Sequence, residues 1–182
     1  RRARMGLARS YQITSVFDQL TVKENLSLAI QAHNGHSFRF WGKAGGDPVT
    51  RREIEPAMAR VGLEERSEVP AVKLSHGEKR QLEVGMALVG KPKMLLLDEP
   101  YAGMGPGGAV ELTKLIQRLK GAVTILLVEH DMGAVFSLAD RITVLVYGQA
   151  IASDTPEAIR ADPSVRQAYL GDEIFAQGRT DA

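Results

Sequence analysis

The sequence predicts an α/β fold in which a parallel sheet follows a mostly helical region. Two short aliphatic runs, residues 94–97 and 123–128, have the length and composition of buried strands. Residues 109–120 between them are long enough for one helix, as expected for a β-α-β unit. Upstream of residue 93, apolar residues repeat at helical rather than strand spacing. We therefore expect a helical part followed by a sheet with both strands buried.

The helical part opens with residues 21–33, which begin with the capping-box pattern Thr-x-x-Glu. Residues 34–48 are rich in glycine and aromatic residues and are predicted to be a loop. A second helix is predicted over residues 51–61, ending at Gly62. The buried stripe of the first helix should consist of Val22, Leu26 and Ile30.

The part after residue 131 should continue the α/β pattern. We predict a helix near residues 132–138 and a third strand over 142–147. Gly148-Gln149 can turn that strand into a hairpin. Thr155-Pro156 is typical of a helix start, so the tail should hold short helices.

Composition limits the class of protein. The chain has 182 residues, enough for one good core, and its formal net charge of +1 gives no electrostatic reason to expect nucleic acid as a partner. Without cysteine it forms no disulfides or thiolate metal sites, which fits a reducing compartment. The longest apolar run, residues 122–128, is far below the roughly 20 residues of a membrane span. Any membrane contact should come through a partner.

Titratable side chains follow two strands that we expect to be neighbours. Residues 94–97 lead into Asp98-Glu99, and residues 123–128 lead into Glu129-His130-Asp131. Ligands of open parallel sheets bind beyond the carboxyl ends of the strands. A carboxylate there suits Mg²⁺, and a second one can orient water for phosphoryl transfer. The alternative is that these acids only solvate the strand ends.

Residues 75–78, Ser-His-Gly-Glu, form a second capping box that needs no ligand. Gly77 nevertheless costs up to about 1 kcal/mol of helix propensity against alanine. We expect it to contribute no packing and instead to let an anion approach the positive end of the helix. The capping box and a phosphate site can coexist.

These motifs in order resemble those of the ATP-binding cassette (ABC) ATPases. LSHGE resembles the signature loop, MLLLDEP the Walker B strand with its catalytic glutamate, and VEHD the switch-histidine segment. Tyr11-Gln12 followed by TVKEN resembles the Q-loop and the start of the helical subdomain. The resemblance implies an α/β, P-loop NTPase-like (RecA-like) parallel-sheet core with an inserted helical subdomain. The stretch from residue 128 to 171 is similar to ATPases of branched-chain amino-acid importers and their urea- and amide-transporting relatives.

The resemblance also implies roles for single residues. Asp98 would hold Mg²⁺ and Glu99 would be the general base. Gln12 would contact the metal or the water and sense a transmembrane partner, and His130 would contact the γ-phosphate. The signature residues would bind the ATP held by a second subunit, because family members close head to tail: Ser75, His76, Gly77 and Glu78.

The resemblance further implies an ATP-hydrolysing importer subunit for branched-chain amino acids or related small solutes. Its partners would be transmembrane permease subunits and a second ATPase subunit, in a homo- or heterodimer. It would be peripheral, at the cytoplasmic face of the inner membrane, with no nucleic acid bound. The implied organisation is a Q-loop segment, a helical subdomain with the signature, a core with Walker B and the switch histidine, and a helical tail: residues 1–20, 21–92, 93–153 and 154–182.

Two positions depart from the family pattern. His76 and Glu78 stand where the commonest signature, LSGGQ, has glycine and glutamine. The Glu78 carboxylate must therefore be offset by nearby Arg80 or turn away into the capping role. Gly105 stands where many relatives have Asp or Asn, which puts communication across a dimer in doubt.

A larger departure concerns the P-loop, Gly-x-x-x-x-Gly-Lys-Ser/Thr, which the sequence does not contain. Gly42-Lys43 is followed by Ala44 and lacks the upstream glycine at the right spacing. In the family the P-loop precedes the Q-loop. We therefore expect a chain cut from a longer one, with its N-terminal strands and P-loop missing, and inactive alone.

Three alternatives stay open. The chain can be a non-catalytic, ABC-like interaction module. It can be a dinucleotide-binding enzyme, since residues 103–108 fit Gly-x-Gly-x-x-Gly, although five residues separate them from the strand where the fingerprint has a tight turn. DNA-repair and translation members of the ABC class are a further possibility, but they carry extra domains or basic regions that we do not find here.

Overall fold

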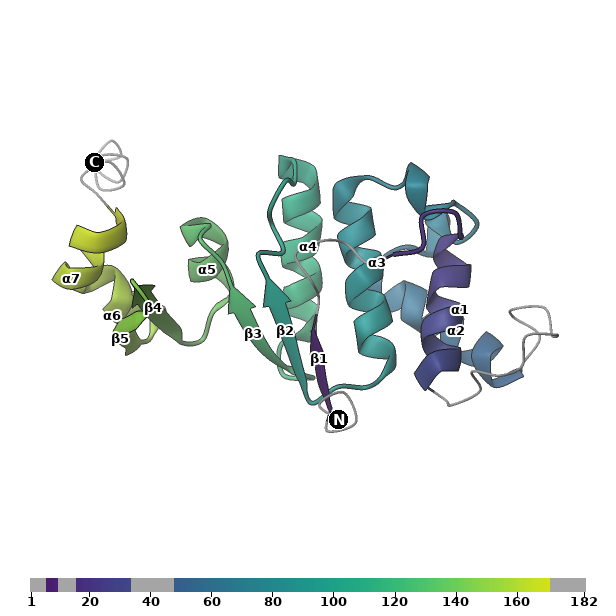
Figure 1. The fold of residues 1–182 in the computed structure, drawn as a ribbon, viewed down its shortest axis with the longest axis horizontal. Coiled ribbons are helices and arrows are strands. Elements are labelled where there is room, and N and C mark those ends of the chain that lie inside the picture. The colour runs from purple at the N-terminus through teal and green to yellow at the C-terminus, as the bar shows by residue number, and fades with distance from the viewer. Residues whose placement is uncertain (1–5, 10–15, 34–47, 171–182) are drawn as a thin grey trace. The chain divides into compact units, whose positions relative to one another are not determined.

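The structure, a computed structural model, describes residues 6–9, 16–33 and 48–170 (Figure 1). The chain divides into two units, Arg1–Asp131 and Met132–Ala182. Within the described residues, no helix combines the length and apolar character needed to cross a membrane.

A parallel sheet with strand order β1-β2-β3 forms the centre of the first unit. The strands are β1 (Leu7–Arg9), β2 (Met94–Asp98) and β3 (Thr124–Val128), and helix α4 (Pro106–Leu119) connects β2 to β3 (Figure 1). The predicted strands are confirmed. The predicted burial is confirmed for β2, where Leu95 and Leu97 are fully buried. It is wrong for β3, an edge strand of the described sheet, where Leu126 is 51% exposed.

Helices α1 (Val22–His33), α2 (Pro48–Val61) and α3 (His76–Val89) pack against one another. The predicted stripe of α1 is confirmed, because its three apolar residues are almost fully buried. Helix α2 begins at Pro48, inside the predicted loop, since proline is well suited to the first helical position. A Cβ on Gly85 would lie 3.1 Å from Val61 Cγ1, so this glycine lets α2 and α3 approach closely. Two 3₁₀ turns, η2 (Glu64–Arg66) and η3 (Ala71–Lys73), lead from α2 to α3.

The second unit is an antiparallel hairpin covered by short helices. Strands β4 (Ile142–Val146) and β5 (Gln149–Asp154) pair as predicted, but the turn is Tyr147-Gly148 instead of Gly148-Gln149. Both turn residues have positive φ, 48° and 79°, as a type I′ turn requires. The core comprises Ile142, Val144, Ile159 and Val165. The helices are α5 (Met132–Leu138), α6 (Pro156–Ala161), α7 (Pro163–Val165) and the π-type turn η4 (Arg166–Leu170).

Candidate functional site

The strand ends place three of the predicted site residues together. Asp98 pairs with Val128 in the β2–β3 register, so the residues that follow the two strands lie side by side at the carboxyl edge of the sheet. His130 Nδ1 lies 3.8 Å from Glu99 Oε1. The structure thus brings Asp98, Glu99 and His130 to one edge, whereas Gln12 lies outside the described residues.

The backbone of Glu99 adopts a left-handed conformation, with φ of 43°. This conformation is uncommon for residues other than glycine and costs on the order of 1–3 kcal/mol. Two hydrogen bonds hold it: the Glu99 N–H donates to the Val128 carbonyl at 2.8 Å, and the Glu99 carbonyl accepts from the Ala102 N–H at 3.1 Å. Arg80 Nη2 lies 3.5 Å from the same carbonyl. The backbone strain therefore lies at Glu99, the residue expected to be the general base.

Asp98 is paired with Arg9, which comes from the short strand β1. Arg9 Nη2 donates to Asp98 Oδ2 at 3.0 Å, and both side chains are partly exposed. Within the described ranges, no group of three or more His, Cys, Asp or Glu residues could hold a metal by itself. Mg²⁺ in phosphoryl-transfer sites is bound by one or two carboxylates together with substrate phosphates and water. Asp98 fits that role, and a bound Mg²⁺ would compete with Arg9 for its carboxylate.

A third carboxylate, Glu129, organises the loops around this edge. Its side chain is only 1% exposed. Its carboxylate accepts hydrogen bonds from the backbone N–H groups of Tyr101, His130 and Asp131, at 2.9, 3.0 and 3.3 Å. From the sequence, Glu129 was expected only as an acid that follows a strand, so this role was missed. The available signal was an acid directly between a buried strand and the predicted switch histidine.

Tyr101 joins the same arrangement from the loop after β2. Its hydroxyl forms a 2.8 Å hydrogen bond with the Thr113 hydroxyl on α4. Burial raises the pKa of Tyr101, and the negative charges of Glu129 and Asp131 raise it further, against the lowering effect of the Thr113 hydrogen bond. Tyr101 therefore remains a neutral phenol that fixes this loop to α4.

The predicted capping box at the start of α3 is confirmed. The Ser75 hydroxyl accepts from the Glu78 N–H at 3.2 Å, and the Glu78 carboxylate accepts from the Ser75 N–H at 2.8 Å. Glu78 was expected either to be offset by Arg80 or to turn into the capping role, and it adopts the capping role. Its counter-cation is Arg66, whose Nε lies 2.8 Å from Glu78 Oε1. Arg80 instead forms a buried ion pair with Glu83 at 2.6 Å.

The pKa of Glu78 reflects these contacts. Partial burial alone would raise the pKa, but the hydrogen bonds from Ser75 and the contact with Arg66 outweigh burial and lower it. Glu78 is thus a carboxylate whose charge is already compensated by Arg66 of the same chain. Ser75 and His76 are exposed beside it, so the turn presents a hydroxyl and an imidazole to solvent.

The expectation that Gly77 contributes no packing was wrong. Gly77 is buried, and a Cβ placed on it would lie 2.9 Å from Gly108 Cα. The first turns of α3 and α4 therefore touch backbone to backbone. The contact also explains the last glycine of residues 103–108, while Gly105 is the N-cap of α4 and Gly103 has φ of 72°. The dinucleotide pattern is thus accounted for by local structure.

The segment that precedes α1, residues 16–21, is fixed by one buried amide. Asn25 is fully buried, and its Oδ1 accepts from the Phe17 N–H at 2.8 Å. Its Nδ2 donates to the carbonyls of Phe17, Leu20 and Thr21 at 3.0–3.2 Å. Asn25 belongs to the TVKEN stretch, but its role depends on contacts that the pattern alone does not show.

The same segment is also attached to the start of α3. Asp18 Oδ1 accepts from Lys79 Nζ at 2.8 Å, and the Asp18 carbonyl accepts from the Val72 N–H at 2.9 Å. Thr21 forms an isolated antiparallel bridge with Pro70. Residues 16–21 are therefore joined directly to residues 70–79, which include the capping box of Ser75 and Glu78.

The family model described as "ABC transporter" matches residues 1–102, more than half of the chain. The chain belongs to the ABC transporter family. A second model, "Branched-chain amino acid ATP-binding cassette transporter", matches residues 151–174.

Curated members of the ABC transporter family are similar in sequence to nearly the whole of this chain. The "High-affinity branched-chain amino acid transport ATP-binding protein LivG" of Salmonella typhimurium is 38% identical over 93% of this chain and 69% of its own length. LivG of Escherichia coli K12 gives the same values. So does BraF of Pseudomonas aeruginosa, which carries the same description.

Solved ABC cassettes share the fold. A nucleotide-free ATP-binding cassette of an ABC transporter superposes with a TM-score of 0.75 at 27% identity, over 93% of this chain and 70% of that one. An ATP-binding cassette of an ABC transporter in its ADP conformation superposes with a TM-score of 0.75 at 27% identity, over 94% of this chain and 70% of that one. These similarities confirm the predicted α/β, P-loop NTPase fold. They also confirm that the chain belongs to the ABC ATPases, which are enzymes that couple ATP hydrolysis to transport.

Proposed function

We propose that this chain is the ATP-binding subunit of an ABC importer for branched-chain amino acids or related small solutes. Two findings support the solute class: relatives at 38% identity are described as branched-chain amino acid transport proteins, and residues 151–174 match the corresponding family model. The subunit would be peripheral, at the cytoplasmic face of the inner membrane, and would drive transmembrane permease subunits.

In this proposal, residues at the carboxyl edge of the sheet catalyse ATP hydrolysis. Glu99 orients and deprotonates the attacking water, and His130 contacts the γ-phosphate. Asp98, with Gln12, would hold Mg²⁺, which would neutralise charge on the phosphates. The observation that carries the assignment is the 3.8 Å separation of His130 Nδ1 and Glu99 Oε1, directly beyond Asp98.

The signature turn would serve a second nucleotide. Ser75, His76, Gly77 and Glu78 begin α3, where backbone N–H groups and the helix dipole favour an anion. Because Arg66 compensates Glu78, its carboxylate does not add an unpaired negative charge there. In a head-to-tail homo- or heterodimer this turn would close on the ATP held by the partner subunit.

The substitution Glu99→Gln tests the catalytic assignment in the full-length protein. We expect ATP turnover to fall by at least about 100-fold, as for loss of a general base, while ATP binding persists. Glu157→Gln, at an exposed position on α6, is the matched control and should leave turnover unchanged. Unchanged turnover in Glu99→Gln would remove Glu99 from the role of base.

A non-catalytic role as an interaction module is the second candidate. The observation that favours it is that these 182 residues contain no Gly-x-x-x-x-Gly-Lys-Ser/Thr motif. A Mg²⁺-ATP titration of the 182-residue chain beside the full-length protein separates the two. We expect only the full-length protein to bind and hydrolyse ATP, and absence of turnover in both would favour the interaction module.

A further inference from the structure

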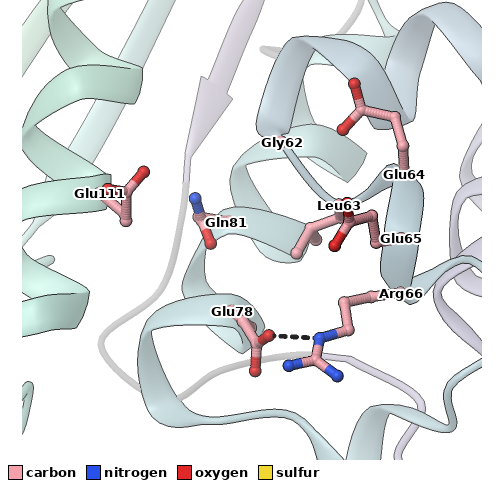
Figure 2. Close-up of a pocket in the computed structure, with 8 residues that line it drawn as sticks. All are labelled: Gly62, Leu63, Glu64, Glu65, Arg66, Glu78, Gln81 and Glu111. Atoms are coloured by element: carbon pink, nitrogen blue, oxygen red, sulfur yellow. Dashed lines mark hydrogen bonds and ion pairs between the residues drawn. The ribbon is translucent and has the colours of Figure 1, made fainter.

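A pocket of about 540 Å³ lies in the first unit, away from the sheet edge described above (Figure 2). It is half open to solvent and is bordered by the turn that follows α2, by the first turns of α3 and by α4. Carboxylates from all three elements line it, and Arg66 is the basic residue among the lining side chains. The acidic lining residues are Glu64, Glu65, Glu78 and Glu111.

A buried amide faces this pocket without a hydrogen-bond partner. Gln81 exposes only 6% of its surface and lines the pocket between the α2 turn and α4 (Figure 2). Across the ranges that the structure describes, its side chain forms no hydrogen bond. Buried side-chain amides are nearly always hydrogen-bonded, so an unpartnered one indicates a missing ligand or water. This observation is independent of the acidic lining.

The charges of the lining are only partly compensated. Glu78 is committed to Arg66 at 2.8 Å, and Glu111 accepts from Lys114 at 2.8 Å in an exposed pair. Glu64 and Glu65 form no ion pair with any other residue that the structure describes.

One further basic side chain lies at the pocket rim. Arg118 Nη2 is 3.9 Å from the point where a Cβ on Gly62 would lie. Even with Arg118 included, negative charge exceeds positive charge. Four carboxylates line the pocket, and the cationic side chains beside them are three: Arg66, Lys114 and Arg118. The pocket therefore favours a cation that also donates hydrogen bonds.

We propose that this pocket binds a guanidinium group. A guanidinium carries five N–H donors in a plane, so it can pair with one carboxylate through two of them and still donate to an amide oxygen. Glu65 and Glu64 supply the carboxylates, and Gln81 supplies the acceptor. The group can come from an arginine side chain of another polypeptide or from free arginine. Because the pocket contacts α3 within two turns of Ser75, its occupant touches the signature helix.

The test follows the Gln81 side-chain amide by NMR in the full-length, ¹⁵N-labelled protein. The probe is N-acetyl-L-arginine amide, and the matched control ligand is N-acetyl-L-citrulline amide, which keeps the shape but is uncharged. We expect a saturable shift of the Gln81 amide signals with the arginine derivative and at least about tenfold weaker binding of the citrulline derivative. Tighter binding of acetyl-Gly-Arg-Gly-amide than of free L-arginine would assign the guanidinium to a polypeptide, and tighter binding of free L-arginine would assign it to the free amino acid.

Variants give the second part of the test. Measured by isothermal titration calorimetry, Glu65→Gln and Gln81→Leu should each weaken binding of the arginine derivative by about fivefold or more, whereas Glu157→Gln should not change it. Glu65 is exposed, so its substitution reports on binding even if Gln81→Leu impairs folding. Equal binding of the arginine and citrulline derivatives, or equal weakening by Glu65→Gln and Glu157→Gln, would overturn the proposal. A Gln81 signal that does not move would indicate a pocket filled by water only.

Discussion

Substitution of Gly77 by alanine should separate the first turns of α3 and α4. The added methyl would lie 2.9 Å from Gly108 Cα, compared with about 3.5–4.0 Å for two carbon atoms in favourable contact. The neighbouring atom belongs to the backbone, so a change of rotamer cannot relieve the overlap. The helices must therefore move by several tenths of an ångström.

The expected magnitude is the difference between two opposing effects. Overpacking of a well-packed contact costs about 1–3 kcal/mol. Alanine in place of glycine within a helix returns up to about 1 kcal/mol. With the full return, we therefore expect Gly77→Ala to lower the free energy of unfolding by up to about 2 kcal/mol.

Urea unfolding monitored by circular dichroism would measure this difference, with Gly107→Ala as the matched control. Gly107 is in the first turn of α4, and a Cβ on it would meet no atom within 4 Å. That variant should be as stable as the unsubstituted protein or more stable by up to about 1 kcal/mol. If Gly77→Ala were as stable as Gly107→Ala but bound ATP more weakly, the packing explanation would be refuted and only the anion-approach role of Gly77 would remain.

Three further outcomes are expected. Glu129→Gln should cost about 1–3 kcal/mol, because the amide cannot satisfy every N–H group now bound by the carboxylate, and ATP turnover should fall as His130 shifts; a fully active variant of normal stability would contradict this. Asn25→Leu should also cost about 1–3 kcal/mol in thermal or urea unfolding, since it leaves the Phe17 N–H without its acceptor and removes one of the hydrogen bonds at each of three carbonyls; a neutral effect would show that water replaces the amide. The lowered pKa of Glu78 contributes stability that is present above the ordinary glutamate pKa of about 4.3 and is lost as pH falls through the folded-state value. The unfolding free energy should therefore decline less steeply below that pH in Glu78→Gln, which retains a capping acceptor but loses the charge facing Arg66, and identical pH profiles would argue against this assignment.

Features set by nearby residues could be predicted from the sequence. The capping boxes at Thr21 and Ser75 depend on a residue three positions away, and both are present. The buried strand β2 and the hairpin are also visible as local patterns. These features sufficed to place Asp98, Glu99 and His130 at one edge of the sheet.

Features that depend on distant segments could not be predicted. The contact between Gly77 and Gly108 joins two helices whose spacing no single motif encodes. The three N–H groups bound by Glu129 come from two different loops, so the residue looks like any strand-end acid in the sequence. Strand β1 has only three residues, too few to show a period of two.

The hydrogen bonds of Asn25 have a mechanical consequence for residues 16–21. One side chain holds the backbone of this segment at Phe17, Leu20 and Thr21, and Asp18 ties the segment to Lys79. A force applied to the segment would have to rupture several bonds together before the segment could bend on its own. We therefore expect the segment to move as a rigid unit. A displacement of it would be transmitted to helices α1 and α3 instead of bending the segment itself.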